Sequence, residues 1–440
     1  MAIASPQPIS IWWVIPFALF LVAIALMPLV HRHWWEKNYG KMSLALAAMV
    51  GAYYLLWAHS IGPWVHSMVD YVSFMILLGS LYVASGGIVI TVGRKATPLT
   101  NCILLLFGAL ISNVFGTTGA SMLLIRPFLR MNQQHLKPYH VVFFIFIVSN
   151  AGGMLTPVGD PPLFLGFLRG VPFWWNLEHC RWAWVFVMGA LLAIFFVLDR
   201  RNHPKEERHH EKDPGPAVHI VGIQNFLFIA LIVGAVFQVG FGDVISMMHR
   251  EGISVRAVLR LIFCREMLML MAAGASRLLT GEVIYQRNAF SYGPIKEVAV
   301  LFFGLFATMV PALQWLGENA QRMALRTAGQ YYFTTGSLSA ALDNAPTYVA
   351  FFELELGKVP REQRPAALAN PQANRKLIAI ALGAVLFGAM TYIGNGPNFM
   401  VKSIADAAGA PTPDFARYML HYSLPILLPL YVVVWWVFLR

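Results

Sequence analysis

Long apolar segments, separated by short polar ones, dominate the chain. A helix rises 1.5 Å per residue, so about 20 apolar residues cross the hydrocarbon core of a bilayer. We predict such helices at residues 11–30, 42–58, 71–92, 182–198, 224–240, 257–276, 296–316 and 418–438. These segments are continuous and do not alternate with polar positions in blocks of about ten residues, as membrane β-barrel strands do. The pattern therefore predicts an all-α polytopic membrane protein.

Four further apolar segments are interrupted in the middle by Gly, Pro, Asn, Asp or Thr. They are residues 100–130, 140–168, 331–356 and 377–404. An interruption leaves backbone groups without helical partners, which a bilayer tolerates only where the break is packed in protein or lines a cavity. We predict two re-entrant helical hairpins, 100–130 and 331–356, and two broken helices, 140–168 and 377–404. With the continuous helices this gives about 10 transmembrane helices.

The interrupted segments occur in matching pairs. Each member of the first pair has a small or polar residue, then Asn, a Gly or Pro break, a Thr and an apolar run. Its two sequences are ISNVFGTTGASMLLIR at 111–126 and LSAALDNAPTYVAFF at 338–352. The second pair is SNAGGMLTPVGDPPLFLG at 149–166 and TYIGNGPNFMVKSI at 391–404. Paired interrupted helices in two halves of a chain are typical of secondary transporters with internal repeats.

We accordingly divide the chain into a first repeat, 1–198, and a second repeat, 224–440, joined by a polar cytoplasmic linker, 199–223. The cytoplasmic side of a membrane protein is enriched in Lys and Arg, which places most basic residues of the first repeat on that side. Counting crossings from there opens the first hairpin to the cytoplasm and the second to the opposite side, so the repeats are inverted. Five basic residues conflict with this orientation: Lys358, Arg361, Arg364, Arg375 and Lys376.

The composition agrees with a membrane protein. Of 440 residues, 58% are hydrophobic and only 12% are charged; the charged share is about half that of soluble proteins. An ordinary soluble enzyme and a disordered chain are thereby excluded. The net charge of +11 comes from short clusters between apolar segments, so it indicates membrane orientation and no nucleic-acid partner. The three cysteines lie far apart, without metal-ligand spacing.

The sequence contains no HExxH, GxSxG or Walker A motif. We therefore expect no enzymatic activity and no resident cofactor. Transport would then draw on an ion gradient, with Na⁺ and H⁺ as transported or coupling ions. We expect the chain to be a multi-pass protein of the bacterial inner membrane.

Polar side chains gather at the two predicted hairpin tips. They are Ser112, Asn113, Thr117, Thr118, Ser339, Asn344 and Thr347. Their oxygens suit a small, hard cation such as Na⁺. Alternatively, they satisfy interrupted backbone and hold helices together. For the whole set in matched breaks, we favour a cation or substrate site.

Two carboxylates, Asp160 and Asp343, lie inside apolar segments next to breaks. An ionisable residue at such depth costs about 2.5–3.5 kcal/mol on insertion scales and is a functional candidate. Exchange of a proton for a cation at these groups would be the minimal machinery of antiport. Alternatively, each Asp only caps the helix that follows it. Arg126 closes the first hairpin, either as an anchor at the membrane face or as the partner of an anion.

Three motifs resemble those of one transporter group. SNAGGMLTPVGDPP at 149–162 resembles the "NAGG…TPxGD" signature of the ion transporter superfamily, especially NhaD-type sodium/proton antiporters and citrate-transporter-like relatives. LDNAPTYVAFFE at 342–353 resembles the "DNxPT" hairpin tip of the same group, which arsenite pumps share. GNGPNFMVKSIAD at 394–406 is similar to the citrate-transporter-like (CitMHS-like) subgroup.

The resemblance implies an inverted-repeat fold, a homodimer, and an elevator-like transport body built from both hairpins and both broken helices. It also implies a cation site in each half. The implied residues are Asn113, Thr117, Thr118, Asn150, Thr156 and Asp160 in the first half and Asp343, Asn344, Thr347, Asn395 and Asn398 in the second. Na⁺ would bind near Asn113, Asp160, Asp343 and Asn344.

The chain departs from the dicarboxylate branch of that group at both tips. Ser112-Asn113 is followed by Val114, and Asp343 stands where that branch has Ser. A carboxylate at a tip repels citrate unless a cation neutralises it, which favours a sodium (or lithium)/proton antiporter. A cation-coupled transporter of citrate, dicarboxylate or arsenite is the alternative. A non-transporting membrane scaffold or sensor is a third hypothesis, which four broken helices disfavour.

Overall fold

The computed structural model describes residues 9–92, 96–202, 218–251, 255–288, 290–319 and 325–440. Within these ranges, seven helices are long and apolar enough to cross a membrane, and two apolar helices, Ile11–Ile24 and Gln224–Ala235, are shorter. The prediction of an all-α polytopic membrane protein is confirmed. Much of the predicted linker, residues 203–217, lies outside the described ranges.

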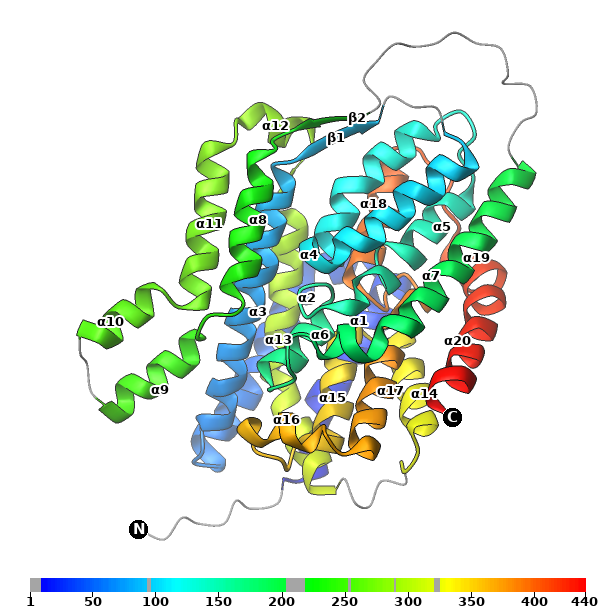
Figure 1. The fold of residues 1–440 in the computed structure, drawn as a ribbon. Helices are drawn as coiled ribbons and strands as arrows, with labels where there is room; N and C mark the ends of the chain where they lie inside the picture. Colours follow the sequence, from blue (N-terminus) through cyan, green and yellow to red (C-terminus); the bar gives the residue numbers. More distant parts are fainter. Residues whose placement is uncertain (1–8, 93–95, 203–217, 252–254, 289, 320–324) are drawn as a thin grey trace.

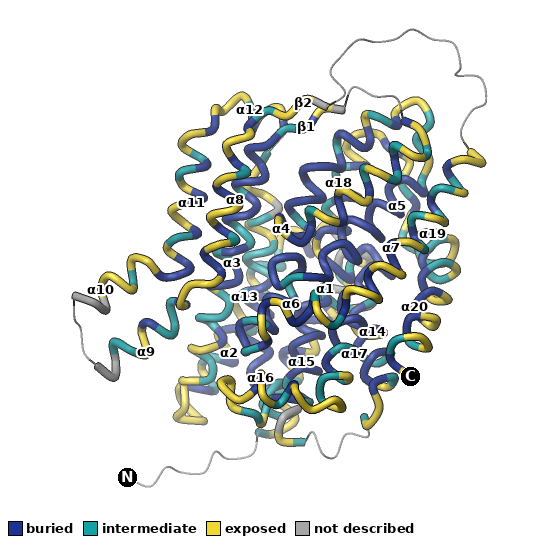
Figure 2. The backbone as a smooth tube through the Cα atoms, viewed as in Figure 1, coloured by how far each residue is buried: buried dark blue, intermediate teal, exposed yellow. Residues whose placement is uncertain are grey.

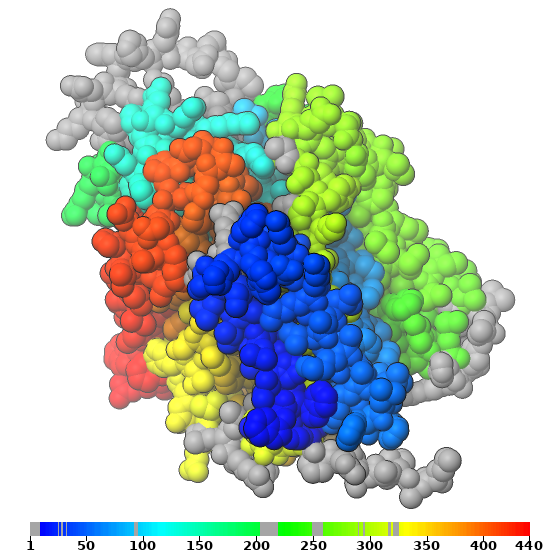
Figure 3. Space-filling view, turned by 180° about the vertical axis from the view of Figure 1, so that it is seen from behind, coloured from blue at the N-terminus to red at the C-terminus, as the bar shows by residue number. Residues whose placement is uncertain are grey.

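One group of helices, here called the frame, occupies the left and the back of the molecule in Figure 1. Its members are α1 (Ile15–Val30), α2 (Arg32–Ala52), α3 (Gly62–Gly86), α8 (Gln224–Ala235), α11 (Arg265–Leu279) and α13 (Gly293–Asn319). Within the frame, α13 packs on α2 and α3, and α11 packs on α3 and α8. Seen from behind in Figure 3, the blue N-terminal helices lie between the green helices and the yellow-to-red C-terminal third.

The remaining large helices form a second group, here called the core body. Its members are α4 (Pro98–Met131), α5 (Pro138–Ile147), α6 (Pro161–Leu168), α7 (Trp175–Asn202), α14 (Ala328–Ala341), α15 (Asn344–Leu356), α17 (Pro371–Phe387) and α18 (Gly396–Ala407). Every residue of α5 from Tyr139 to Ile147 is buried, so its tube is dark in Figure 2. The core body meets the frame where α4 packs on α3 and α15 packs on α13.

The helix α4 folds back on itself at Gly116. That residue has φ 72° and ψ 155°, a conformation that glycine adopts without steric cost. Asn101 and Asn132, near the two ends of α4, exchange side-chain hydrogen bonds of 2.8 and 2.9 Å. A straight helix would hold them about 47 Å apart. Residues 98–131 are therefore a hairpin whose tip is Gly116.

The helices α14 and α15 form the second hairpin. The chain reverses at Leu342 and Asp343, which separate the two helices. The Tyr331 hydroxyl donates a 2.8 Å hydrogen bond to Glu355 Oε2 and joins the open ends. In Figure 1 the first hairpin opens towards the top and the second towards the bottom, so the two tips approach the middle of the molecule from opposite sides.

Both broken helices contain a 3₁₀ turn followed by an extended segment. In the first, η3 (Ala151–Leu155) lies between α5 and α6; in the second, η6 (Gly388–Met390) lies between α17 and α18. A side chain at Gly159 would collide with the Gly153 carbonyl oxygen, and one at Gly394 would lie 2.6 Å from the Gly388 carbonyl oxygen. Close approach of backbone to backbone therefore requires glycine at corresponding places in the two halves.

Two sequence predictions fail locally. The helix predicted at 257–276 is two helices, α10 (Val255–Ile262) and α11, because Arg265 and Glu266 form a buried 2.7 Å ion pair at their junction. The helix predicted at 71–92 ends at Gly86. Its last residues form β1 (Val89–Val92), a run rich in β-branched residues that pairs antiparallel with β2 (Val218–Val221).

The other elements are short or peripheral. The helices α9 (Phe241–Glu251) and α10 project to one side in Figure 1. The C-terminal span Phe415–Leu439 consists of α19 (Phe415–Tyr418), η7 (Met419–Leu427), α20 (Leu428–Val434) and η8 (Trp435–Leu439). The rest are η1 (Ile11–Val14), η2 (Tyr53–Trp57), α12 (Glu282–Arg287), η5 (Arg361–Gln363) and α16 (Arg364–Ala367).

Several of the basic residues that conflict with the predicted orientation have acidic partners. Arg364 lies 3.7 Å from Glu353, and Lys376 lies 3.0 Å from Glu355. Glu353 also pairs with Arg169 at 3.1 Å, and Arg169 with Asp70 at 3.4 Å. These charges at the bottom of Figure 1 are therefore partly balanced within the fold.

Candidate functional site

The site is centred on the Asp160 carboxylate, where the two hairpin tips meet. Thr117 Oγ1 donates to Asp160 Oδ1 at 3.0 Å, and Asn395 Nδ2 donates to the same oxygen at 3.2 Å. Asn344 Nδ2 donates to Asp160 Oδ2 at 2.8 Å. Asp160 is 1% exposed, and its three partners are buried as well. One buried carboxylate thus joins both hairpin tips and both broken helices.

The two breaks that supply Asp160 and Asn395 have the same local structure. TPVGDPP at 156–162 and TYIGNGP at 391–397 share the pattern Thr-x-(Val/Ile)-Gly-(Asp/Asn)-x-Pro. In the first, the Gly159 amide donates to Thr156 Oγ1 at 3.1 Å; in the second, the Gly394 amide donates to Thr391 Oγ1 at 3.0 Å. Asp160 and Asn395 are therefore equivalent positions of the internal repeat.

The hairpin tips dock on the breaks in the same way in both halves. The Thr117 amide donates to the Gly159 carbonyl at 2.8 Å, and the Asn344 amide donates to the Gly394 carbonyl at 3.2 Å. These bonds give the backbone amides at the two hairpin tips acceptors that their own helices do not provide. They also fix the side chains of Thr117 and Asn344 towards the carboxylate.

Three asparagines extend the cluster away from Asp160. Asn395 Nδ2 lies 3.2 Å from Asn150 Oδ1, and Asn150 Nδ2 donates to Asn398 Oδ1 at 2.6 Å. Asn398 in turn donates to the Gly388 and Thr391 carbonyls at 2.8 and 3.0 Å. This network holds the two broken helices in register, because each amide is bonded to the opposite half or to a break.

One oxygen of the cluster has no hydrogen-bond donor. Asn344 Oδ1 is buried and, within the described part of the chain, has no hydrogen-bond partner. Its amide cannot be turned over, because its oxygen would then face Asp160 Oδ2. An unpartnered amide oxygen beside a carboxylate suits a hard cation such as Na⁺. The described residues contain no group of three or more His, Cys, Asp or Glu side chains that could hold a metal ion.

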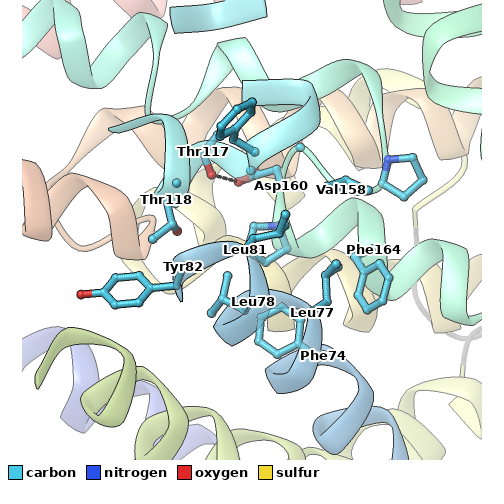
Figure 4. Close-up of a pocket in the computed structure, with 16 residues that line it drawn as sticks. Phe74, Leu77, Leu78, Leu81, Tyr82, Thr117, Thr118, Val158, Asp160 and Phe164 are labelled. Carbon is cyan, nitrogen blue, oxygen red and sulfur yellow. Dashed lines mark hydrogen bonds between the residues drawn. The ribbon is translucent and has the colours of Figure 1, made fainter. Parts of the chain in front are cut away.

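A small cavity lies next to Asp160, between the first hairpin tip and the frame (Figure 4). The first hairpin tip and the first break line one side, and Phe74, Leu77, Leu78, Leu81 and Tyr82 of α3 line the other. Its volume is about 20 Å³, enough for one water molecule or a bare ion. A solute as large as citrate enters only if α3 and the hairpin tip separate.

The family assignment follows from a comparison over the whole chain. A family model described as "Putative citrate transport" matches residues 6–439. The chain belongs to this family. A search of curated proteins finds no match. The predicted resemblance to the citrate-transporter-like subgroup is confirmed, and the chain is a multi-pass membrane protein of a transporter family. The family description does not extend to sodium/proton antiport.

Several predicted site residues of this family member bond to backbone instead of facing Asp160. Ser112 donates to the Val148 carbonyl at 2.9 Å, and Ser339 to the Ala384 carbonyl at 2.6 Å. Thr347 donates to the Asp343 carbonyl at 3.0 Å. Thr156 donates to the Asn113 carbonyl. In this structure these side chains satisfy interrupted backbone, as the alternative interpretation describes.

Asn113, Thr118 and Asp343 lie near the tips without a hydrogen bond to the Asp160 carboxylate. Asn113 Nδ2 donates to the Gly152 carbonyl at 2.8 Å, and its Oδ1 accepts from the Leu155 amide at 2.9 Å. Thr118 lines the cavity. Asp343 Oδ1 accepts from the Ala345 amide at 3.1 Å and caps α15.

The sequence analysis did not predict that α3 lines one side of the cavity beside Asp160. Phe74, Leu77 and Leu81 are apolar residues in an uninterrupted helix, and nothing in that pattern separates a cavity wall from a lipid-facing or core position. Only the break residues carry a local signal. The wall becomes visible once α3 is seen packed on α4.

Proposed function

We propose that the chain is a cation-coupled secondary transporter of citrate-type carboxylates in which Asp160 binds the coupling cation, Na⁺ or H⁺. The observation that carries the proposal is the single buried carboxylate held by Thr117, Asn344 and Asn395 from both halves. The family description supports the carboxylate substrate. The elevator-like movement, the homodimer and the bacterial inner membrane remain predictions from the resemblance.

Electrostatics favours a bound cation at Asp160. Removing an ionised carboxylate from water costs several kcal/mol even after relaxation. Its three hydrogen-bond donors are neutral, so they offset this cost in part and leave the charge in place. A proton or Na⁺ would neutralise it, and Asn344 Oδ1 offers a further oxygen ligand for Na⁺. Binding of the cation would therefore stabilise the meeting point of the tips.

The small volume of the cavity explains why coupling of the cation to the solute would require movement of the protein. A carboxylate solute does not fit into about 20 Å³. Access therefore needs separation of the core body from α3, and closure follows when both the cation and the solute are bound. The inverted hairpins open to opposite sides in Figure 1, so the same pocket can be reached from either side in turn.

Sodium or lithium/proton antiport is the second candidate, favoured by the ion-sized cavity. In that mechanism Asp160 would bind H⁺ and the metal cation alternately, and no larger solute would need to enter. The two candidates differ in whether a carboxylate solute is required. Citrate-type transport requires one, and antiport does not.

The purified chain in proteoliposomes tests both. Imposed Na⁺ or pH gradients should drive accumulation of labelled citrate, and Asp160→Asn should abolish it. Asp414→Asn is a matched control, because Asp414 is an exposed N-cap of α19 and Asn caps equally well. Gradient-driven citrate uptake by the Asp160→Asn protein would refute the role of Asp160. Na⁺-dependent proton movement without citrate uptake would establish antiport instead.

A further inference from the structure

Arg126 is a half-buried cation that has no carboxylate partner in the described part of the chain. It lies on the second arm of the α4 hairpin, and its Nη1 atom is buried without a hydrogen-bond partner among the residues that the structure describes. Within the same residues, no carboxylate lies within ion-pair distance of it, whereas Arg169, Arg265 and Arg364 all have one. An anchor at the membrane face would keep its guanidinium in water or among lipid headgroups.

The position of Arg126 relates it to the cavity beside Asp160. Gly119 lines that cavity, and a residue seven positions further lies on the same face of a helix, about 10 Å along its axis. Helical side chains lean towards the N-terminus of their helix, which for this arm is the tip. Tyr82, another lining residue, lies within electrostatic range of Arg126. In Figure 4, Tyr82 and Thr118 lie near each other at one edge of the cavity lining.

The electrostatic surroundings of Arg126 favour an anion. Its charged neighbour is Arg130, one turn further along and exposed. A planar guanidinium binds a carboxylate through two parallel hydrogen bonds. The missing partner of Nη1 is the kind of group that a carboxylate solute supplies.

We propose that Arg126 binds a carboxylate group of the transported anion, on the route between α3 and the second arm of the first hairpin. This inference rests on the proposed function, because it assigns the residue that recognises the substrate. Asp160 at the first break holds the cation and Arg126 on the first hairpin holds the anion, so the two ions occupy separate places in the first repeat.

Three variants in proteoliposomes test the proposal. Arg126→Gln removes the charge and should raise the KM for citrate by about 10- to 100-fold, the loss expected for a charge-assisted hydrogen bond. Arg126→Lys keeps the charge without the two parallel donors of the guanidinium and should give an intermediate KM. Arg130→Gln, the matched control on the same arm, should change the KM less than about threefold because its exposed charge is screened.

Binding in detergent separates recognition from folding. Citrate, at saturating Na⁺, should raise the unfolding temperature of the wild-type and Arg130→Gln proteins and not of Arg126→Gln. Stabilisation by Na⁺ alone should persist in Arg126→Gln, which shows that the variant is folded. An unchanged citrate KM and thermal shift in that variant would overturn the inference and leave the proposed function intact. A wild-type protein that neither binds nor transports citrate, succinate or acetate would overturn both.

Discussion

Exchanging Asp160 and Asn395 between the two repeats is the sharpest test of the site. The two residues occupy equivalent positions, and Asn395 Nδ2 lies 3.2 Å from Asp160 Oδ1. The double variant Asp160→Asn/Asn395→Asp keeps the same atoms in the cluster and moves the charge by one hydrogen-bond length. We expect it to recover part of the cation-driven transport that Asp160→Asn alone loses.

The expected changes in stability and in Na⁺ stabilisation distinguish the two single variants and the double variant. In Asn395→Asp alone, two carboxylates about 3.2 Å apart would repel by roughly 5 kcal/mol at an effective dielectric constant of about 20. That variant should therefore unfold more readily without cations and bind a second cation or a proton. In Asp160→Asn, the stabilisation by Na⁺, about 2.7 kcal/mol at a hundredfold excess over Kd, should disappear. The double variant should regain Na⁺ stabilisation.

Recovery should be partial because the new carboxylate meets different neighbours. Asn395 Nδ2 also donates to the Ser149 carbonyl at 3.1 Å, and a carboxylate there would face that oxygen unless a cation lies between them. The assays are the unfolding temperature with and without Na⁺ and Na⁺-driven citrate uptake in proteoliposomes. A folded double variant with no more Na⁺ response than Asp160→Asn would refute the equivalence of the two positions.

Three further predictions address the packing around the site. Gly159→Ala should destabilise the protein by about 1–3 kcal/mol, because the added methyl group would collide with the Gly153 carbonyl. Gly396→Ala is the control and should not destabilise it, because nothing lies within 4 Å of the added methyl group. Thermal unfolding measures both variants. Glu353→Gln should cost about 1–3 kcal/mol, because Arg169 loses this partner and keeps Asp70. Glu282→Gln, at an exposed pair, should cost less than about 1 kcal/mol, and equal costs would contradict this. Asp343→Asn should keep the cap of α15 and transport citrate within about threefold of wild type, and loss of uptake by a folded variant would give Asp343 a direct role.

The breaks could be predicted from the sequence because their signals are local. Gly116, Pro161 and Pro397 interrupt apolar segments, and no other arrangement accommodates such residues in a membrane protein as readily. The motif that ends in Asp160 could be matched to the motif that ends in Asn395 for the same reason. Asp160 could therefore be singled out as a site residue because it lies beside a break.

The partners of each polar side chain could not be predicted. Asn113 and Asn344 both follow a small or polar residue near a tip in the sequence, yet Asn113 bonds to backbone and Asn344 bonds to Asp160. The difference depends on packing between segments that are 184 residues apart for Asn344 and Asp160. The junction between α10 and α11 at Arg265 was not predicted for a similar reason. In the sequence alone, an ion pair inside an apolar segment cannot be distinguished from the charges of a helix at the membrane interface.

Two unbalanced charges of the first repeat suggest why coupling would be strict. If both proposals hold, the empty first half of the site carries one negative charge at Asp160 and one positive charge at Arg126. A cation alone neutralises the first and leaves a net positive charge; a carboxylate alone neutralises the second and leaves a net negative charge. Moving a net charge past the apolar wall of α3 is costly, so the empty and doubly occupied states would move most readily. Any further carboxylates of a citrate-type solute would need additional cations, which predicts uptake of more than one cation per molecule.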